Sequence, residues 1–367
     1  MIKKISFAIA ILIVCFIPAA LTSCSAMGTN PSTSDQLNFK NSNQFFPEKE
    51  EFDNIVPHLK DSMQANFSMI DVIWDDMWAK DNTPSELLPQ IKPDLKAFQE
   101  PSDKIKSIWL GHSSFLLNID GKMVLLDPVF GEEASPVFFA VNRYQESVIS
   151  LEELPPIDVI VISHDHYDHL DMETVEFFVG KKTHFVTPLG VGSHLRGWGI
   201  EVANISENDW WEAVTIDSIE YTATPAQHFS GRGLDANRTL WASWVIQSKN
   251  QKIYFSGDSG YSPHFKEIAN RLGPFDFAYL ECGQYNEAWA QIHMTPDQIV
   301  QAYQDLGVKQ AQPIHWGMFD LSLHAWYEPI EAIHSRHQKG LVNIVAPKIG
   351  ETIVLGQEFE VKVWWEH

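Results

Sequence analysis

Three histidines and three aspartates crowd into eight residues, 164–171, which we call the His loop. Imidazole nitrogens and carboxylate oxygens are ligands for divalent cations, and at this density they are costly to bury without one. His164 and His166 stand two positions apart, so in an extended segment they face the same way and can bind one ion. If the chain then turns into a helix, Asp168 and His169 point toward a second ion. The spacing predicts a metal site and not an ordinary polar surface loop.

The elements around the His loop are those of an α/β protein. Residues 158–163 are almost wholly apolar, as in a central strand covered on both faces, and they run directly into the loop. Residues 171–178 then predict a helix. The loop therefore lies at the carboxyl end of a buried strand.

Two metal ions that share a water need six or seven ligands, and the His loop supplies four. Further candidates stand where β-rich sequence enters a loop, namely His228, Asp258 and His315. Gly257 and Gly260 flank Asp258 closely and would let the backbone approach an ion. Spacing alone leaves open whether the two histidines are ligands or ordinary histidines among the 15 in the chain.

Residues 115–127 and 246–258 share one plan, a strand, a turn and a second strand that ends in an aspartate. Each is followed by a Pro-x-Asp step and another apolar strand, at residues 156–158 and 274–276. Hairpins are common, so the likeness can be coincidence. The alternative is a duplicated half, which predicts two sheets face to face, helices outside, and the loops of both halves at one edge.

The His-x-His-x-Asp-His pattern resembles the metallo-β-lactamase superfamily. Neighbouring segments narrow the resemblance to the branch of N-acylphosphatidylethanolamine phospholipase D and its bacterial relatives. These segments follow in order over about residues 105–325: Trp109–Leu117, Leu125–Phe130, Pro225–Gly233, Asn237–Trp244, Gly257–Tyr261 and Ile314–Phe319. The resemblance implies an α/β fold, the four-layer αβ/βα sandwich of two mixed sheets with external helices and with the metals at one edge between the sheets.

The resemblance also implies a ligand set for two Zn²⁺ ions, although Mn²⁺ or Fe²⁺ would fit the same donors. One ion would be bound by His164, His166 and His228, the other by Asp168, His169 and His315, with Asp258 bridging. Such a pair of ions produces a bridging hydroxide that attacks an ester or phosphodiester without a serine or cysteine nucleophile. Asp168 and Asp258 are thus also candidate catalytic residues.

Three further residues, His293, Asp127 and His112, stand outside the implied ligand set and are candidates for supporting roles. His293 resembles a family histidine near the substrate phosphate and is a third catalytic candidate, although Ile292 separates it from Gln291 where the mammalian phospholipase has the two adjacent. Asp127 either accepts a hydrogen bond from a ligand histidine or is a solvated hairpin end. His112 is predicted to be structural.

Two arginines lie within the segments that carry the resemblance, and one cysteine lies outside them. Arg232 and Arg238 either meet a substrate anion or, by default, pair with acidic side chains. Cys282 is predicted to be a small buried residue.

The N-terminus predicts export. Lys3 and Lys4 precede an apolar run, so residues 1–23 read as a lipoprotein signal peptide, and the residues before Cys24 resemble the bacterial lipobox. A lipid on Cys24 would anchor the protein in the cell envelope, in the inner or outer membrane on the periplasmic side. Residues 24–40 predict a flexible tether, 41–103 an N-terminal extension, and 104–367 the hydrolase domain.

The extension is rich in aromatic residues and shows helix-like apolar spacing over residues 63–78. Its aromatic side chains are predicted to pack on the domain, with the lining of an entrance for an apolar substrate as the alternative. They are Phe45, Phe46, Phe67, Trp74 and Trp78.

Composition limits the function. The 367 residues, 44% of them hydrophobic, describe a globular chain, and 26 basic against 48 acidic residues leave a net charge of −22, which disfavours nucleic acid as a partner. A single phosphate headgroup is not excluded. With only Cys15, Cys24 and Cys282, no disulfide framework is expected.

The leading hypothesis is a dinuclear zinc hydrolase of a phosphodiester, such as N-acyl phosphatidylethanolamine, acting on a phospholipid or small molecule at a membrane surface. The alternatives are a hydrolase of lactones or other non-phosphate esters, and a non-catalytic metal-binding envelope lipoprotein.

Overall fold

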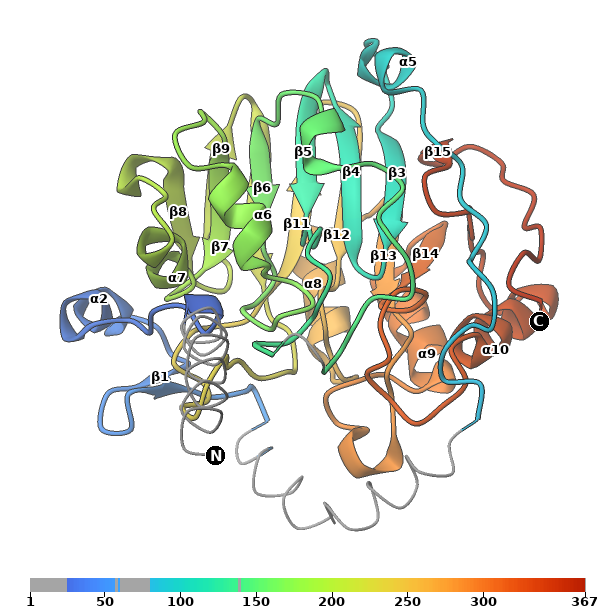
Figure 1. Ribbon diagram of the computed structural model, residues 1–367. Helices are drawn as coiled ribbons and strands as arrows, with labels where there is room; N and C mark the ends of the chain where they lie inside the picture. The colour runs from blue at the N-terminus through green and yellow to red at the C-terminus, as the bar shows by residue number, and fades with distance from the viewer. Residues whose placement is uncertain (1–24, 57–58, 60–79, 138–139, 367) are drawn as a thin grey trace, which may run out of the picture.

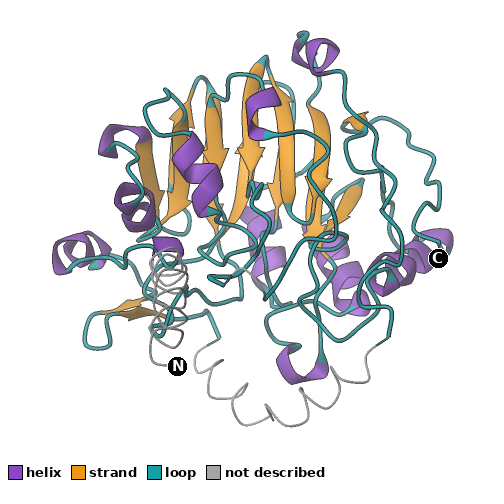
Figure 2. Ribbon diagram, viewed as in Figure 1, coloured by secondary structure: helices purple, strands orange, loops and turns teal. Residues whose placement is uncertain are grey.

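Two mixed β-sheets pack face to face and carry helices on their outer sides (Figures 1 and 2). The structure is a computed structural model, and it describes residues 25–56, 59, 80–137 and 140–366. This is the four-layer arrangement of two mixed sheets that the resemblance implies.

The seven-stranded sheet contains, in spatial order, β15 (Thr352–Val354), β3 (Lys106–Gly111), β4 (Ser114–Ile119), β5 (Lys122–Leu126), β6 (Val159–Val161), β7 (His184–Pro188) and β8 (Ile205–Asn208). The six-stranded sheet contains β14 (Ala311–Ile314), β13 (Phe277–Glu281), β12 (Lys252–Phe255), β11 (Ser243–Gln247), β10 (Ile219–Thr224) and β9 (Ala213–Ile216).

The outer helices cover each sheet with their apolar sides. α6 (Met172–Phe177) begins after Asp171, whose side chain accepts hydrogen bonds from the backbone N–H groups of Glu173 and Thr174. Its Val175 packs in the cluster on the outer face of the seven-stranded sheet. The helices α8 (His264–Leu272), α9 (Pro296–Leu306) and α10 (Glu328–Gln338) pack their buried residues with the six-stranded sheet. The helix predicted after the His loop is therefore confirmed.

Shorter elements complete the described chain. They are α2 (Thr33–Phe39), β1 (Phe45–Phe46), β2 (Glu51–Phe52), α5 (Leu95–Gln99), α7 (Gly192–Gly197) and the 3₁₀ turns η1 (Leu151–Glu153), η2 (Val202–Asn204) and η3 (Glu287–Trp289). Among the described residues, no helix is both long and apolar enough to cross a bilayer.

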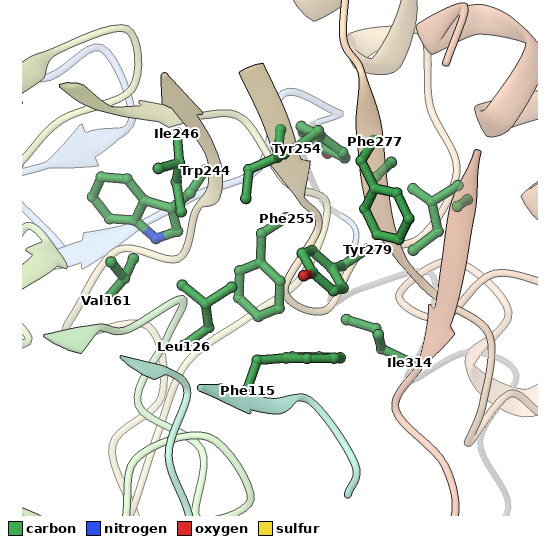
Figure 3. Close-up of a cluster of buried hydrophobic side chains, with 14 of the residues drawn as sticks. Phe115, Leu126, Val161, Trp244, Ile246, Tyr254, Phe255, Phe277, Tyr279 and Ile314 are labelled. Carbon is green, nitrogen blue, oxygen red and sulfur yellow. The ribbon is translucent and has the colours of Figure 1, made fainter. Parts of the chain in front are cut away.

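The main core lies between the sheets, where large side chains from both meet (Figure 3). Phe115 and Leu126 from one sheet point toward Phe255 and Tyr279 from the other, and all four are fully buried. The ring centroids of Phe115 and Tyr279 are 4.3 Å apart. Burying a side chain of this size contributes about 1.5 to 3 kcal/mol. Cys282 is a free, buried cysteine in the same core, as predicted.

The two stretches with a shared plan form equivalent hairpins, one in each sheet. β4 and β5 are joined through Asp120 and Gly121, and β11 and β12 through residues 248–251. In each sheet the second hairpin strand then pairs in parallel with the next strand, β6 or β13. The duplicated layout is confirmed, and it sets the carboxyl ends of these strands at one edge of each sheet.

The prediction of a flexible tether over residues 24–40 is wrong from Ser25 onward, because this segment is held on the domain. The Ser25 carbonyl accepts a hydrogen bond from Trp198 Nε1 at 2.9 Å. Phe39 is buried against Phe45 and Phe52, with ring centroids 5.3 to 5.4 Å apart. The polar composition of this segment suggested flexibility because the partners of its backbone groups belong to distant parts of the chain and cannot be seen in the local sequence.

The aromatic extension is described in part. Phe45 packs on the domain as predicted, whereas Phe46 is 38% exposed. The signal peptide, Cys24 and the helix predicted over residues 63–78 lie outside the described residues, as do Phe67, Trp74 and Trp78.

Candidate metal centre

The seven predicted ligands converge at one edge of the sandwich, between the sheets. Each follows the carboxyl end of a strand: the His loop follows β6, His228 follows β10, Asp258 follows β12 and His315 follows β14. β12, β13 and β14 are parallel, and β10 runs in the same direction because both β10 and β12 are antiparallel to β11. All seven side chains are buried except that of His166, which is half-buried.

Three imidazole nitrogens form the first donor group. Nδ1 of His166 lies 3.0 Å from Nε2 of His164 and 3.2 Å from Nε2 of His228. Two nitrogens that bind one tetrahedral ion at about 2.0 Å are about 3.3 Å apart. The spacing of the three nitrogens therefore fits a shared cation.

The second donor group contains Asp168, His169 and His315, and the structure adds His112 to it. Oδ2 of Asp168 lies 3.3 Å from His169 Nε2, 3.2 Å from His315 Nε2 and 2.9 Å from His112 Nε2. The carbonyl of His112 also accepts a hydrogen bond from the His315 N–H, at 3.2 Å. His112 thus has the predicted structural contact, but its buried ring also contacts a candidate ligand, which the sequence did not indicate.

Asp258 lies between the two groups. Its Oδ1 is 3.1 Å from His169 Nε2, and its Oδ2 is 3.0 Å from His315 Nε2. The same Oδ2 is 3.7 Å from His228 Nε2 and 3.9 Å from His164 Nε2. One carboxylate therefore reaches both groups, which is the position that a bridging ligand requires.

Two buried polar atoms of the candidate ligands, His169 Nε2 and Asp258 Oδ1, lie 3.1 Å apart but form no hydrogen bond of good geometry with any described residue, and His112 Nδ1 beside them also lacks a partner. Buried polar atoms are nearly always satisfied, so such a pair in one place calls for an explanation. A divalent cation bound by both would supply it. Nitrogen and carboxylate oxygen donors suit zinc, manganese or iron. The residues present fit a metal site.

The electrostatics of the cluster also favour a cation. Burial would raise the pKa of Asp168 and Asp258, but neighbouring histidines hold both well below their usual range. Burial would lower the pKa of His315, but Asp258 and Asp168 raise it to about 10. The carboxylates thus hold protons on histidines, and a metal ion would displace these protons as it binds.

Asp127 is fully buried just after β5 and braces the second group. Its Oδ2 accepts a hydrogen bond from His169 Nδ1 at 2.7 Å, and its Oδ1 accepts one from the Ser163 N–H at 2.7 Å. Burial raises the pKa of Asp127, and the hydrogen bonds from His169 and Ser163 offset part of that rise. With its proton held on Nδ1, His169 keeps Nε2 available for a cation. The contact with a candidate ligand histidine is the one predicted, and the solvated hairpin end is not observed.

His293 lies beside the centre and is held by a carboxylate that the sequence analysis missed. Its Nδ1 donates to Oε1 of Glu281 at 2.5 Å, and Glu281 is fully buried at the end of β13. The His293 ring stacks on that of His315, with centroids 5.1 Å apart, and lies 5.2 Å from that of His228. The available signal was a single carboxylate at the end of an otherwise apolar strand.

The two arginines have partners within the protein. Arg232 is buried, and its guanidinium donates to the carbonyls of Asp165 and Ala26 at 2.7 Å each. It therefore braces the His loop, a role that neither prediction anticipated. Arg238 pairs with Glu50 at 2.5 Å, the default that the sequence analysis named.

Gly257 and Gly260 allow other segments of the chain to approach the backbone on either side of Asp258 closely. A Cβ at Gly260 would lie 1.8 Å from the carbonyl oxygen of Gln291. At Gly257, where φ is 54°, a Cβ would lie 2.6 Å from that of Ser163. The expectation that these glycines serve contact with an ion is therefore replaced by a packing role around Asp258.

A cavity of about 380 Å³ opens onto the centre. Candidate metal ligands and apolar side chains line it together, which suits a substrate with one polar group and an apolar remainder. A larger groove of about 760 Å³ lies near the opposite ends of the strands, and none of the candidate ligands lines it. The apolar side chains around the smaller cavity are Ala134, Tyr167, Phe229, Trp289, Ile292 and Leu321.

Comparison with known sequences identifies relatives. The family model described as "Beta-lactamase superfamily domain" matches residues 122–316, more than half of the chain. An uncharacterized protein of Mycobacterium tuberculosis is 39% identical over 287 residues, 77% of each chain. N-acyl-phosphatidylethanolamine-hydrolyzing phospholipase D 1 of Caenorhabditis elegans is 34% identical over 233 residues, 60% of this chain and 65% of that one. Outer membrane protein RomA of Klebsiella pneumoniae is 52% identical over 101 residues, 28% of this chain and 76% of that one.

Comparison with solved structures agrees on the fold. Isothiocyanate hydrolase from Delia radicum gut bacteria superposes with a TM-score of 0.55 at 19% identity, over 68% of this chain and 99% of that one. The matched family region runs from β5 to the residue after His315, so it contains all seven converging side chains. The chain therefore belongs to the metallo-β-lactamase superfamily of metal-dependent hydrolases, on the branch that includes the N-acyl-phosphatidylethanolamine-hydrolyzing phospholipases D.

Proposed function

We propose that this protein is a hydrolase that uses two divalent cations, with zinc as the leading candidate, to cleave a phosphodiester. The observation that carries the proposal is the pair of donor groups joined by Asp258, which line a cavity together with apolar side chains. One ion would be held by His164, His166 and His228, and the other by Asp168, His169 and His315, with Asp258 shared.

Bound divalent ions would lower the pKa of water toward neutrality and polarise a phosphoryl oxygen. The residues of the chain hold the site in place for that chemistry. Asp127 keeps the proton of His169 on Nδ1, so that Nε2 faces the donor group. Glu281 likewise accepts from Nδ1 of His293, which leaves Nε2 of that ring as a hydrogen-bonding atom for a substrate oxygen at the cavity wall. Asp168, Asp258 and His293 are the proposed catalytic residues.

The proposed substrate is a phospholipid, of which N-acyl phosphatidylethanolamine is one candidate. A phospholipid joins a phosphodiester to apolar chains, which matches a cavity lined by candidate metal ligands and apolar side chains. The name of the Caenorhabditis elegans relative supports this choice. The lipobox-like residues before Cys24 and the name of the Klebsiella relative support a place in the cell envelope, where a lipid anchor would hold the enzyme at its substrate's surface.

The test combines metal analysis of the purified protein with a panel of phosphodiesters, phospholipids and lactones. We expect two metal ions per chain and turnover of phosphodiesters. Asp258→Asn should lower both metal content and turnover, the latter by about 100-fold or more, because one carboxylate serves both groups. The matched control is Asp276→Asn, which should keep both; the Asp276 carboxylate accepts from the N–H of Lys252 at the start of β12, far from the candidate ligands.

The other outcomes are equally informative. Turnover confined to lactones would contradict the phosphodiesterase proposal and favour hydrolysis of non-phosphate esters. Full metal content without turnover of any class would favour a non-catalytic metal-binding lipoprotein.

A further inference from the structure

The candidate ligand His228 lies on a long loop, residues 225–242, that contains no helix or strand. We call it the His228 loop. A loop of this length cannot fix a side chain to the accuracy that a metal site needs without support from elsewhere. The support comes from the N-terminal segment Ser25–Val56, which we call the strap.

Asn54 of the strap makes two hydrogen bonds to the backbone of His228. Its Oδ1 accepts from the His228 N–H at 3.0 Å, and its Nδ2 donates to the His228 carbonyl at 2.7 Å. The two residues are 174 positions apart in sequence. At its Nδ1 end the His228 ring meets the Ile292 carbonyl at 3.3 Å, while Nε2 faces His166. Backbone and ring are thus held separately, and together they direct Nε2 into the first donor group.

Further contacts near Asn54 connect the strap to the His228 loop. The Phe52 N–H donates to the Asn237 carbonyl at 2.8 Å, and Glu50 pairs with Arg238 at 2.5 Å. The hairpin of β1 and β2 that carries Phe52 is itself anchored, because Phe52 packs against Phe45 with ring centroids 5.1 Å apart. The strap is therefore fixed where it meets the loop.

The first residues of the strap are connected to the His loop through two intermediate side chains, Arg232 and His194. The Ala26 carbonyl accepts from Arg232, which also donates to the Asp165 carbonyl. The Thr29 N–H donates to His194 Nδ1 at 3.0 Å, and Nε2 of the same ring lies 3.2 Å from the Asp165 carboxylate. One N-terminal segment thus contacts the His228 loop directly and is connected to the His loop through the side chains of Arg232 and His194.

We infer that the strap is a working part of the metal centre, and that Asn54 is a positioning residue for His228. The inference rests on the proposed function in so far as it takes His228 as a metal ligand. It gives the N-terminal extension a role outside the region where the family pattern applies. Because Asn54 acts on His228 and makes no contact with the second donor group, its effect should be confined to one of the two ions.

The experiment is a titration of metal-free protein with Co²⁺, followed by its absorption spectrum, for the wild type, Asn54→Ala and Asn30→Ala. Asn30 is the matched control, a strap asparagine whose exposed amide lies 3.5 Å from the exposed carboxylate of Asp235 on the same loop and makes no bond to the His228 backbone. We expect two ions in the wild type and in Asn30→Ala. In Asn54→Ala the affinity of one site should fall by about 10- to 100-fold with a changed spectrum, and the other site should keep its affinity.

Unchanged affinities and spectrum in Asn54→Ala, with two ions bound by the wild type, would overturn the role of Asn54 and leave the metal centre standing. An equal loss at both sites would also overturn it, since general loosening does not discriminate between them. A wild type that binds no metal would overturn the proposed function itself. If Asn54→Ala does not fold, Asn54→Asp keeps the acceptor for the His228 N–H and loses the donor. A smaller loss at the same one site is then expected, and unchanged affinity at that site would overturn the inference.

Discussion

Three residues of the site adopt a backbone conformation that side chains other than glycine rarely take. φ is 51° at His112, 37° at Asp127 and 68° at His315. A non-glycine residue in such a conformation costs about 1 to 3 kcal/mol and persists only where its surroundings hold it. All three contact Asp168 or His169 through their side chains. At the scale of single residues, the fold thus gives up stability where it gathers the candidate ligands.

Asp127→Asn tests the bracing of His169. The variant keeps the size of the side chain and loses the charge that holds the proton on His169 Nδ1. We expect metal affinity to fall by about 10- to 100-fold, as for other residues that orient a ligand histidine. Asp120→Asn, in the turn of the same hairpin, is the control for loss of an aspartate. Equal metal affinity in the two variants, measured by competition with a chelator, would contradict the role of Asp127.

His264→Gln tests a pH dependence of folding away from the candidate ligands. Burial lowers the pKa of His264 to about 3, whereas an exposed histidine titrates near 6.5. The unfolded chain therefore takes up the proton first, and this contribution to stability is present at neutral pH and is lost as the pH falls below 6.5. Between pH 7 and pH 5 the loss is about 2 kcal/mol.

Glutamine offers neutral hydrogen-bonding atoms to Ser259 and Ser262, the partners of His264, and does not titrate. The free energy of unfolding of His264→Gln, from urea denaturation, should therefore fall less than that of the wild type between these two pH values. The same decrease in both proteins would show that His264 does not carry the effect.

At the scale of elements, the His loop is held by more than the strand before it. The Asp165 carboxylate accepts hydrogen bonds from the Gly231 N–H at 2.7 Å and from Thr239 Oγ1 at 2.8 Å. Both donors belong to the His228 loop. Asp165 is not a candidate ligand, but its carboxylate has a structural role because it connects the two loops that form the first donor group.

Arg232→Lys tests this connection. The Arg232 side chain is buried and donates to carbonyls of the His loop and the strap. A lysine cannot reproduce a planar guanidinium with several fixed donors. We expect a loss of about 3 kcal/mol in the free energy of unfolding. Arg238→Lys, at the half-exposed pair with Glu50, should cost less than about 1 kcal/mol. Similar losses in denaturant melts of the two variants would argue against a special role for Arg232.

At the scale of the whole molecule, the site belongs to neither half alone. The half built on the seven-stranded sheet supplies the four candidate ligands of the His loop, and the half built on the six-stranded sheet supplies the other three candidates, His228, Asp258 and His315. A pair of metal ions would therefore link the two sheets at the open edge of the core. The metal ions would cross-link the two halves of the chain, whose three cysteines are too few for a disulfide framework.

Cys24→Ser tests the proposed envelope anchor. Acyl chains contribute about 0.8 kcal/mol per buried methylene, so their loss should move the exported protein from the membrane fraction to the soluble fraction. Labelling with radioactive palmitate in a bacterial host should disappear in Cys24→Ser. Cys15→Ser, inside the predicted signal peptide, should keep the label. Persistent label in Cys24→Ser would refute the proposed attachment site.

The candidate ligands of the His loop and the duplicated hairpins could both be predicted from the amino-acid sequence. Both are short-range patterns: two histidines at spacing two after an apolar strand, and a strand, turn and strand repeated once. The fold class and the membership of His228 and His315 in the site came from the resemblance, since spacing left both histidines open.

Only the tertiary structure decided which residues hold the site in place. The contacts of Glu281 with His293, of the His112 ring with Asp168 and of Asn54 with the His228 backbone join residues 12 to 174 positions apart. No local pattern marks them, because a hydrogen bond depends on where two distant segments meet and not on the residues beside each in the chain. The ordered strap was missed for the same reason, since composition reports the polarity of a segment and not the partners that the folded protein provides for it.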